Sequence, residues 1–331
     1  METQVLKINN NSLSLAKDLI YKDQLVAFPT ETVYGLGGLG TSTKAIETIY
    51  KVKGRPSDNP LIAHVHTDYD LESLIKINHS YVYDLVKKFM PGPLTIVGLS
   101  KGVVKKEATC NLDSLAVRMP MHSGAQAFLK EVNAPIVAPS ANISKHTSAV
   151  TSEHVFADFN GKIPLILDGG KCVGGIESTV LNVMNKTPII LRTGLITKEM
   201  LEATLNKKVD VCDTLKENER VASPGVKYSH YRPNCQTKLF NYDQINIVQE
   251  YYDSCLLEQK NPYILCDDIL AQNFKGLNVL NLGKTANEMA SNLYYLLRQG
   301  EMVADIIIGI IPQGEGGVYD GVKNRLKKAC I

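Results

Sequence analysis

Short apolar runs and helical apolar repeats alternate along the first part of the chain. Six runs have the length and composition of buried strands, at residues 25–28, 61–65, 94–99, 115–119, 135–138 and 179–183. Between several of them, apolar residues recur at helical spacing, as at Leu15, Ala16, Leu19 and Ile20, and again at Ala45, Ile46, Ile49 and Tyr50. This alternation predicts an α/β domain, which we expect to cover residues 1–205.

Residues 206–235 interrupt the pattern. The segment is polar and charged, has no sustained period and is broken by Pro224, Gly225 and Pro233, so we expect a linker that acts as a lid. Beyond it, the strand-like runs KLF, PYILCD and ADIIIGI and a helical pattern at 285–298 predict a second domain over residues 236–331. Its expected form is a smaller, Rossmann-like α/β domain with three layers.

Composition limits the classes of function. A chain of 331 residues exceeds the length at which one core stops growing, so two domains are expected. A net charge of +2 excludes a bulk polycation, so any nucleic acid would have to bind a local basic patch. Seven cysteines without a CxxC pair or zinc-like spacing indicate reduced thiols of a cytoplasmic protein and no protein-held metal. The start lacks the apolar core of a signal peptide, and the run at 306–311 is too short for a bilayer, so we expect no membrane association.

The stretch GLGGLG, which begins at Gly35, fits the G-x-G-x-x-G pattern of dinucleotide folds. Its context argues against that interpretation, because PTETVY separates the glycines from the preceding strand and no strand with an acidic end follows at the spacing that a ribose needs. We interpret PTETVYGLG as a ligand loop, with an ordinary glycine-rich turn as the alternative. Its hydroxyls and its glycines suit a bound ligand: Thr30, Thr32, Tyr34, Gly35 and Gly37.

Cations stand before the second apolar run, in KGRPSDNPLIAHV. Lys53 and Arg55 are candidates for phosphate oxygens, Arg as a bidentate fork and Lys as a point charge. A charge cluster on a loop is more often solvated surface, so that alternative stays open. His64, alone on an apolar strand, is more often a satisfied core histidine than a ligand-binding one.

Two more arginines and several hydroxyls stand at strand ends. Arg118 alternates within an apolar strand, so we expect it to meet either a ligand carboxylate or a buried structural partner. Arg192 ends another strand in LRTG. Short hydrogen-bonding side chains gather in APSANISKHTS and GGIEST, where they suit a nucleotide but equally suit turns and helix caps: Ser140, Asn142, Ser144, Ser148, Ser178 and Thr179.

The chain contains no Ser-His-Asp order, no HExxH motif and no P-loop motif. Its strand-end loops therefore carry cations, hydroxyls and glycines but no activated nucleophile. This combination predicts catalysis by positioning and charge neutralisation, as in phosphoryl or nucleotidyl transfer.

The order of the motifs resembles the Sua5/YrdC family of threonylcarbamoyl-adenylate synthases. Eight motifs span nearly the whole chain: PTETVYGLG, KGRPSDNPL, PGPLT, SLAVRMP, APSAN, GGIESTV, LRTG and SPGVKYSHYRP. The resemblance implies a YrdC-like twisted open sheet with flanking helices, followed by the C-terminal domain of the longer Sua5 form. It implies a reaction that joins L-threonine, bicarbonate or CO2, and ATP into L-threonylcarbamoyl-AMP, with release of pyrophosphate. The product feeds the t6A modification through downstream transferase proteins, so tRNA is an indirect partner.

The same resemblance assigns site residues. The threonine pocket is expected to be lined by Thr32, His64, Arg118, Ala138 and Ser178, with Arg118 on the carboxylate. ATP is expected to be held by Lys53, Arg55, Asn59, Ser114, Ser140, Ser148 and Arg192, with Tyr231 closing over the nucleotide. Lys53 and Arg55 are the expected catalytic residues, because threonine carbamate itself attacks the α-phosphorus and the enzyme supplies only charge neutralisation and alignment. Mg2+ is expected on the phosphates rather than in a carboxylate cage.

Two positions depart from the family pattern. Lys145 stands where the SANxSG motif has glycine, and Thr193 replaces the proline of LRPG. Two competing interpretations also remain: an RNA-binding module, and a carbamoyl-transfer relative that uses carbamoyl phosphate. The cations interleave with glycine and hydroxyl loops more than with exposed aromatic residues, which disfavours the first. The linker and second domain disfavour the second.

Overall fold

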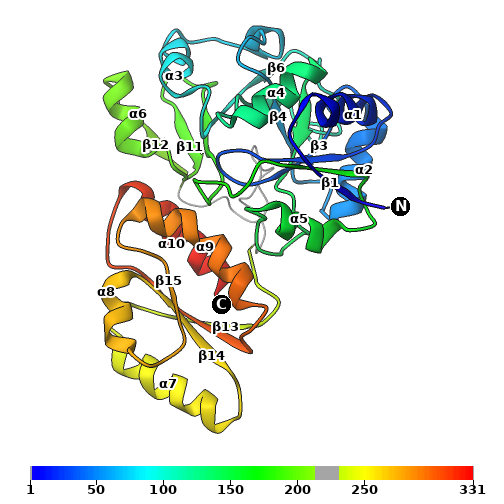
Figure 1. Ribbon diagram of the computed structural model, residues 1–331. Helices are drawn as coiled ribbons and strands as arrows, with labels where there is room; N and C mark the ends of the chain where they lie inside the picture. Colours follow the sequence, from blue (N-terminus) through cyan, green and yellow to red (C-terminus); the bar gives the residue numbers. More distant parts are fainter. Residues whose placement is uncertain (1, 213–230, 331) are drawn as a thin grey trace.

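The computed structural model describes residues 2–212 and 231–330, which form two sheets with helices packed on each (Figure 1). Within these residues the larger sheet has twelve strands, in the order β1-β9-β2-β3-β8-β4-β7-β6-β10-β11-β12, with β5 paired to β6. Its strands are β1 (Gln4–Lys7), β2 (Val26–Phe28), β3 (Gly35–Leu39), β4 (Ile62–His64), β5 (Ile75–Lys76), β6 (Leu94–Ser100), β7 (Ser114–Arg118), β8 (Ile136–Ala138), β9 (Leu165–Asp168), β10 (Thr179–Asn182), β11 (Ile189–Arg192) and β12 (Asp210–Val211). All six predicted strands are confirmed.

Helices cover both faces of the larger sheet. They are α1 (Asn10–Tyr21), α2 (Thr43–Lys53), α3 (Tyr81–Phe89), α4 (Ser123–Val132), α5 (Ser152–Phe159) and α6 (Lys198–Leu205), with a 3-10 turn at Leu71–Ser73. Alternation along β2 divides the core, since Val26 and Phe28 pack with α1 and α4 while Ala27 packs with α2 on the other face. Ser42 caps the start of α2, and Gly54 ends it in the left-handed conformation with a φ of 62°. The expected α/β sheet with flanking helices is therefore confirmed.

The stretch GLGGLG is a strand and not a loop. Gly35–Leu39 form β3, which is buried and pairs antiparallel with β2. A Cβ on Gly37 would lie 2.8 Å from the Ile136 side chain and 3.0 Å from the Phe28 ring, so the strand needs glycine for packing. The expectation that the ligand loop continues through Gly37 is wrong, because these glycines make room for side chains of neighbouring strands.

The second sheet is parallel throughout, and helices on both of its faces complete a three-layer unit. Its order is β13-β16-β14-β15. The strands are β13 (Gln236–Phe240), β14 (Pro262–Cys266), β15 (Val279–Asn281) and β16 (Ile306–Ile310). The helices are α7 (Ile245–Leu257), α8 (Asp268–Ala271), α9 (Ala286–Gly300) and α10 (Gly317–Ala329), with a 3-10 turn at Gln272–Phe274. Helix α7 packs on the face that carries Ile264 and Ile308, whereas α9 and α10 pack on the face that carries Ile307. The expected Rossmann-like form is confirmed.

Helices α9 and α10 lie between the two sheets, next to the loops of the first unit (Figure 1). Arg298 on α9 forms an ion pair with Asp158 on α5, with 2.7 Å between NH2 and Oδ2. Arg325 on α10 pairs with Glu177, which precedes β10, with 3.2 Å between Nε and Oε2. These buried pairs fix the second unit against the first.

The segment between the two sheets is described only at its ends. Strand β12 lies beyond the expected boundary at residue 205 and adds to the larger sheet through parallel pairing with β11. Residues 213–230 of the expected lid, 206–235, lie outside the described residues. None of the helices in the described ranges is long and apolar enough to cross a membrane.

Candidate functional site

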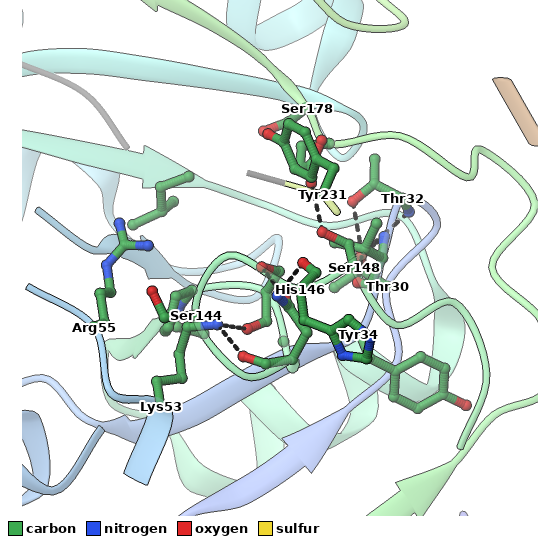
Figure 2. Close-up of a pocket in the computed structure, with 18 of the residues that line it drawn as sticks. Thr30, Thr32, Tyr34, Lys53, Arg55, Ser144, His146, Ser148, Ser178 and Tyr231 are labelled. Atoms are coloured by element: carbon green, nitrogen blue, oxygen red, sulfur yellow. Dashed lines mark hydrogen bonds between the residues drawn. The ribbon is translucent and has the colours of Figure 1, made fainter. Parts of the chain in front are cut away.

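A cavity of about 730 Å³, a volume that includes the solvent at its mouth, lies where several strands of the larger sheet end. It brings together eleven predicted site residues. Figure 2 labels six of them, Thr32, Lys53, Arg55, Ser148, Ser178 and Tyr231, and the other five are His64, Arg118, Ala138, Ser140 and Arg192. Asn59 and Ser114 are absent from its lining, as far as the described residues define the cavity. Figure 2 shows Lys53 and Arg55 on one side of the cavity and Thr30 and Thr32 on the other.

Lys53 and Arg55 reach the cavity from the end of α2. Burial, and then the charge of Arg55, lowers the pKa of Lys53 well below its ordinary value. The Lys53 Nζ donates to the carbonyl oxygens of Ser140 (2.7 Å) and Asn142, so it braces the loop after β8. The Arg55 Nε donates to the Asn59 carbonyl (3.2 Å), and burial lowers the pKa of Arg55 to about 10, which leaves it charged at neutral pH. The Arg55 Nη2 also donates to the Pro60 carbonyl at 3.2 Å, so both side chains are hydrogen-bonded to backbone carbonyl groups.

Arg118 on β7 has a buried structural partner, one of the two expected alternatives, and that partner is Glu31. Its NH2 donates to Glu31 Oε1 at 2.6 Å, its NH1 to Thr32 Oγ1 at 2.9 Å and its Nε to the Gly92 carbonyl at 3.3 Å. Both charged side chains are about one-twentieth exposed. These contacts account for three of the five N–H groups of the guanidinium and fix its plane at the cavity wall.

His64 lies beside Arg118 on the neighbouring parallel strand. Burial, followed by the charge of Arg118, lowers the pKa of His64 to about 3, so the imidazole is neutral at physiological pH. Its Nδ1 lies 3.0 Å from the Ile62 carbonyl and donates to it in this state, which leaves Nε2 as an acceptor. A backbone carbonyl therefore satisfies the Nδ1–H group of His64, and the ring also lines the cavity.

The GGIEST segment supplies a buried carboxylate next to the predicted serines. Ser148 Oγ donates to Glu177 Oε1 at 2.8 Å, and Arg192 donates to the carbonyl (3.0 Å) and hydroxyl (3.1 Å) oxygens of Ser178. Burial by itself raises the pKa of Glu177, but the charges of Arg325 and Arg192 outweigh it and lower the pKa to about 2. Glu177 was not predicted as a site residue, because its only signal in the sequence is its position in a motif of glycine and hydroxyl-bearing residues.

Tyr231 enters the cavity from the end of the linker. Its backbone has a φ of 78°, and its carbonyl accepts from Thr147 Oγ1 at 2.9 Å. Its ring stacks on Tyr294 of α9, with 5.2 Å between centroids. The positive φ costs on the order of 1 kcal/mol for a non-glycine residue, so the surrounding contacts hold this ring in place.

The two departures from the family pattern have a structural account. Lys145 has a φ of 72°, the left-handed conformation that glycine adopts at least cost. Its carbonyl accepts from the Arg232 backbone N–H at 3.0 Å. The Thr193 carbonyl accepts from Arg325 NH1 at 2.6 Å, a contact that a proline at this position also offers.

The arrangement suits an anionic ligand and a small zwitterionic one in the same cavity. Cations come from α2, β7 and β11, and hydroxyl groups come from the loops that precede β3 and follow β8. Glu177, which lines the cavity, and Glu31, which contacts the lining residue Arg118, are each paired with an arginine. Within residues 2–212 and 231–330, no group of three or more His, Cys, Asp or Glu side chains could hold a metal ion. Charge neutralisation is the chemistry that this wall offers.

The fold and cavity define an α/β ligand-binding protein whose site lies at the strand ends of a mixed sheet. The family model Sua5/YciO/YrdC, described as "Telomere recombination", matches residues 18–194, and a second model, described as "Threonylcarbamoyl-AMP synthase, C-terminal domain", matches residues 196–330. The chain therefore belongs to the Sua5/YrdC family.

Relatives of known name support this assignment. A threonylcarbamoyl-AMP synthase of Bacillus subtilis is 38% identical, over 99% of this chain and 95% of the relative. The crystal structure of P. abyssi Sua5 complexed with L-threonine superposes with a TM-score of 0.90 at 35% identity, over 99% of this chain and 96% of that one. A putative threonylcarbamoyl-AMP synthase of Mycobacterium tuberculosis is 30% identical but matches only 55% of this chain, over 83% of its own length.

Proposed function

We propose that the protein joins L-threonine, bicarbonate or CO2, and ATP into L-threonylcarbamoyl-AMP and releases pyrophosphate. One observation carries the proposal: a single cavity holds the Arg118 and Thr32 wall opposite the Arg55 side, with Ser178 and Arg192 also lining it. An amino acid needs a cation for its carboxylate, and a triphosphate needs several cations and backbone donors. Both requirements are met within one enclosure.

In this proposal the threonine carboxylate meets Arg118, which Glu31 holds in a fixed plane. Thr32, His64, Ala138 and Ser178 complete the subsite, because neutral His64 offers an acceptor and Ala138 a small apolar surface. A fixed guanidinium loses little freedom on binding, which favours the bidentate contact.

The nucleotide side is formed by residues from four segments. Arg55 and Arg192 meet the phosphates, Lys53 keeps the Ser140 loop in shape, and Ser148 and Tyr231 lie along the same wall. Asn59 stays a proposed contact, because its buried side-chain amide has no hydrogen-bond partner within the described residues. Ser114, the first residue of β7, stays a proposal that rests on the family resemblance alone.

The chemistry requires no enzyme nucleophile. An oxygen of threonine carbamate forms a bond to the α-phosphorus of ATP, the bond to the bridging oxygen breaks, and pyrophosphate leaves. Arg55 and Lys53 neutralise charge on the phosphates as the bond changes proceed, and positioning supplies the rest. Mg2+ enters as part of the MgATP substrate, since Glu31 and Glu177 are already paired with arginines.

We also propose where the reaction takes place, which proteins receive its product and how the chain divides into domains. The product passes to t6A transferase proteins, tRNA is met indirectly, and the enzyme works in the cytoplasm, in keeping with its seven unpaired cysteines. The chain divides into a YrdC-like catalytic domain (1–205), a linker (206–235) and a C-terminal domain (236–331). The two separate sheets support two domains, and β12 extends the first sheet to Val211, inside the proposed linker.

The test is mass spectrometry of the purified full chain incubated with MgATP, L-threonine and bicarbonate, each omitted in turn. We expect a threonylcarbamoyl-AMP peak and pyrophosphate only when all substrates are present. Salt-sensitive RNA binding by the folded protein, with no nucleotide turnover under any condition, would overturn the proposal in favour of a binding module.

A further inference from the structure

Helices α9 and α10 of the second unit reach the wall of the cavity at Glu177. Oε1 of this carboxylate accepts from Ser148 Oγ at 2.8 Å, on the cavity side. Oε2 accepts from the Tyr294 hydroxyl at 2.9 Å and from Arg325 Nε at 3.2 Å, both from the C-terminal helices. One carboxylate therefore connects a hydroxyl of the site to two side chains that lie more than a hundred residues away in sequence.

This network has almost no access to water. Arg325 and Tyr294 have no exposed surface, and Glu177 is 6% exposed. Removing one partner of such a buried pair leaves an uncompensated charge, whereas replacing both partners by neutral groups is often nearly without cost. The network is thus sensitive to the loss of either charge but tolerant of the loss of both.

Glu177 also feels the charges of two arginines from different parts of the chain. Arg325 comes from α10, and Arg192, at the end of β11, lines the cavity. Both charges act on the Glu177 carboxylate, and Arg192 donates two hydrogen bonds to the adjacent residue, Ser178. If Arg325 is lost, the Glu177 carboxylate retains Arg192 as its cationic neighbour. That charge would then attract Arg192 away from a ligand.

Tyr294 touches the site at a second point. Its ring stacks on Tyr231, which lines the cavity, while its hydroxyl donates to Glu177.

We propose that Arg325 and Tyr294 are positioning residues of the nucleotide site: they hold and neutralise Glu177, so that Ser148 and Arg192 keep the geometry that receives ATP. This inference rests on the proposed function, because it names the partners of the same site. The C-terminal unit then acts as a permanent part of the active-site wall.

The experiment compares Arg325→Met with the double variant Arg325→Met/Glu177→Gln in the full chain. We expect the KM for ATP and the calorimetric Kd for ATP to rise at least about tenfold in the single variant, with the KM for threonine changed less than about threefold. In the double variant most of the ATP affinity should return, because no unpaired buried charge remains. Tyr294→Phe should show a smaller loss of the same kind.

Lys171→Met is the matched control, since Lys171 contacts α9 through Tyr295 and Asn292 at an exposed position outside the cavity. This substitution should leave the KM and the Kd for ATP unchanged. An unchanged ATP Kd in Arg325→Met, or a loss that Glu177→Gln does not relieve, overturns the inference in favour of packing alone. If Arg325→Met does not fold, the double variant and Tyr294→Phe carry the comparison.

The calorimetric measurement separates the two proposals. A wild-type protein that binds ATP but makes no product overturns the proposed function, while the Kd series still decides the positioning role. Wild-type protein that does not bind ATP overturns both.

Discussion

At the scale of single residues, three neighbouring cations have three different environments. Lys51 is exposed on α2, Lys53 is 2% exposed and braces the Ser140 loop, and Arg55 lines the cavity beyond the end of the helix. The left-handed turn at Gly54 separates the last two. Local sequence shows a charge cluster, and only the path of the chain shows which charge faces the ligand.

This difference leads to the first prediction. Arg55→Ala should lower kcat/KM for ATP at least about tenfold, since the loss of one phosphate contact costs about 1.4 kcal/mol in transition-state binding. Lys51→Ala removes the same charge from an exposed position and should stay within about twofold of wild type. Initial rates of pyrophosphate release measure both. Equal effects of the two substitutions would show that general charge, and not a phosphate contact, is responsible.

At the scale of secondary-structure elements, the sequence predicts the helices and strands whose burial produces an apolar run or a periodic apolar pattern. Strands such as β6 were predictable because their residues are mostly apolar and buried in an unbroken run. Strand β1 is mostly exposed, and β15 has one buried residue among three, so neither gives such a run. Cations and hydroxyls after strand ends were predictable as site residues for a similar reason, because strand ends of one sheet meet. Glu31 and Glu177 were not, since each is recognised by an arginine that is distant in sequence.

The loop before β10 shows how one element depends on close approach to another. Gly175 has a φ of 68°, and a Cβ there would lie 2.5 Å from the Ser291 Cα of α9. Ile176 and Glu177 follow directly, so the same approach brings Glu177 within reach of Tyr294. Only glycine permits both the conformation and the contact.

Gly175→Ala should therefore reduce the free energy of unfolding by at least about 3 kcal/mol, from positive-φ strain together with a backbone clash that α9 cannot relieve by a side-chain rotation. Gly170→Ala is the matched control, since Gly170 has a φ of 81° but nothing within 4 Å of an added Cβ. It should cost only about 1 kcal/mol. Urea unfolding followed by circular dichroism compares the two, and equal losses would mean that α9 does not press on this loop.

At the scale of the whole molecule, the two units share a core as well as ion pairs. Ile176 and Ile196 of the first unit belong to one apolar cluster with Met289 and Ala290 of α9. Burial of this kind makes the contact resemble a domain interior more than a transient interface. The units should therefore unfold together, and charges at the contact should affect the stability of the whole chain.

His146 is a titratable group of this contact that lies against two carboxylates. Its ring nitrogens lie 3.2 Å from Asp158 of α5 and 2.9 Å from Glu301 at the end of α9, with Arg298 beside them. Burial lowers the pKa of His146, but the hydrogen bonds to Asp158 and Glu301 outweigh it, so the pKa is raised above 6.5. The folded chain thus holds a proton that the unfolded chain has released, and the resulting stability is complete below pH 6.5 and lost as the pH rises through the raised pKa.

We expect the contribution of His146 to the unfolding free energy to be lost as the pH rises above 6.5, so the advantage of the wild type over His146→Gln should shrink from about pH 6 to about pH 9. Burial lowers the pKa of Lys328 to about 8, which adds stability as the pH rises, and the comparison cancels this term because both proteins carry Lys328. His154→Gln is the control, because burial lowers the pKa of His154 to about 4 and the ring stays neutral over the whole range. Urea unfolding at both pH values measures the difference. A wild-type advantage over His146→Gln that stays constant across this window would show that His146 does not carry a proton at the contact, and that Arg298 alone balances the two carboxylates.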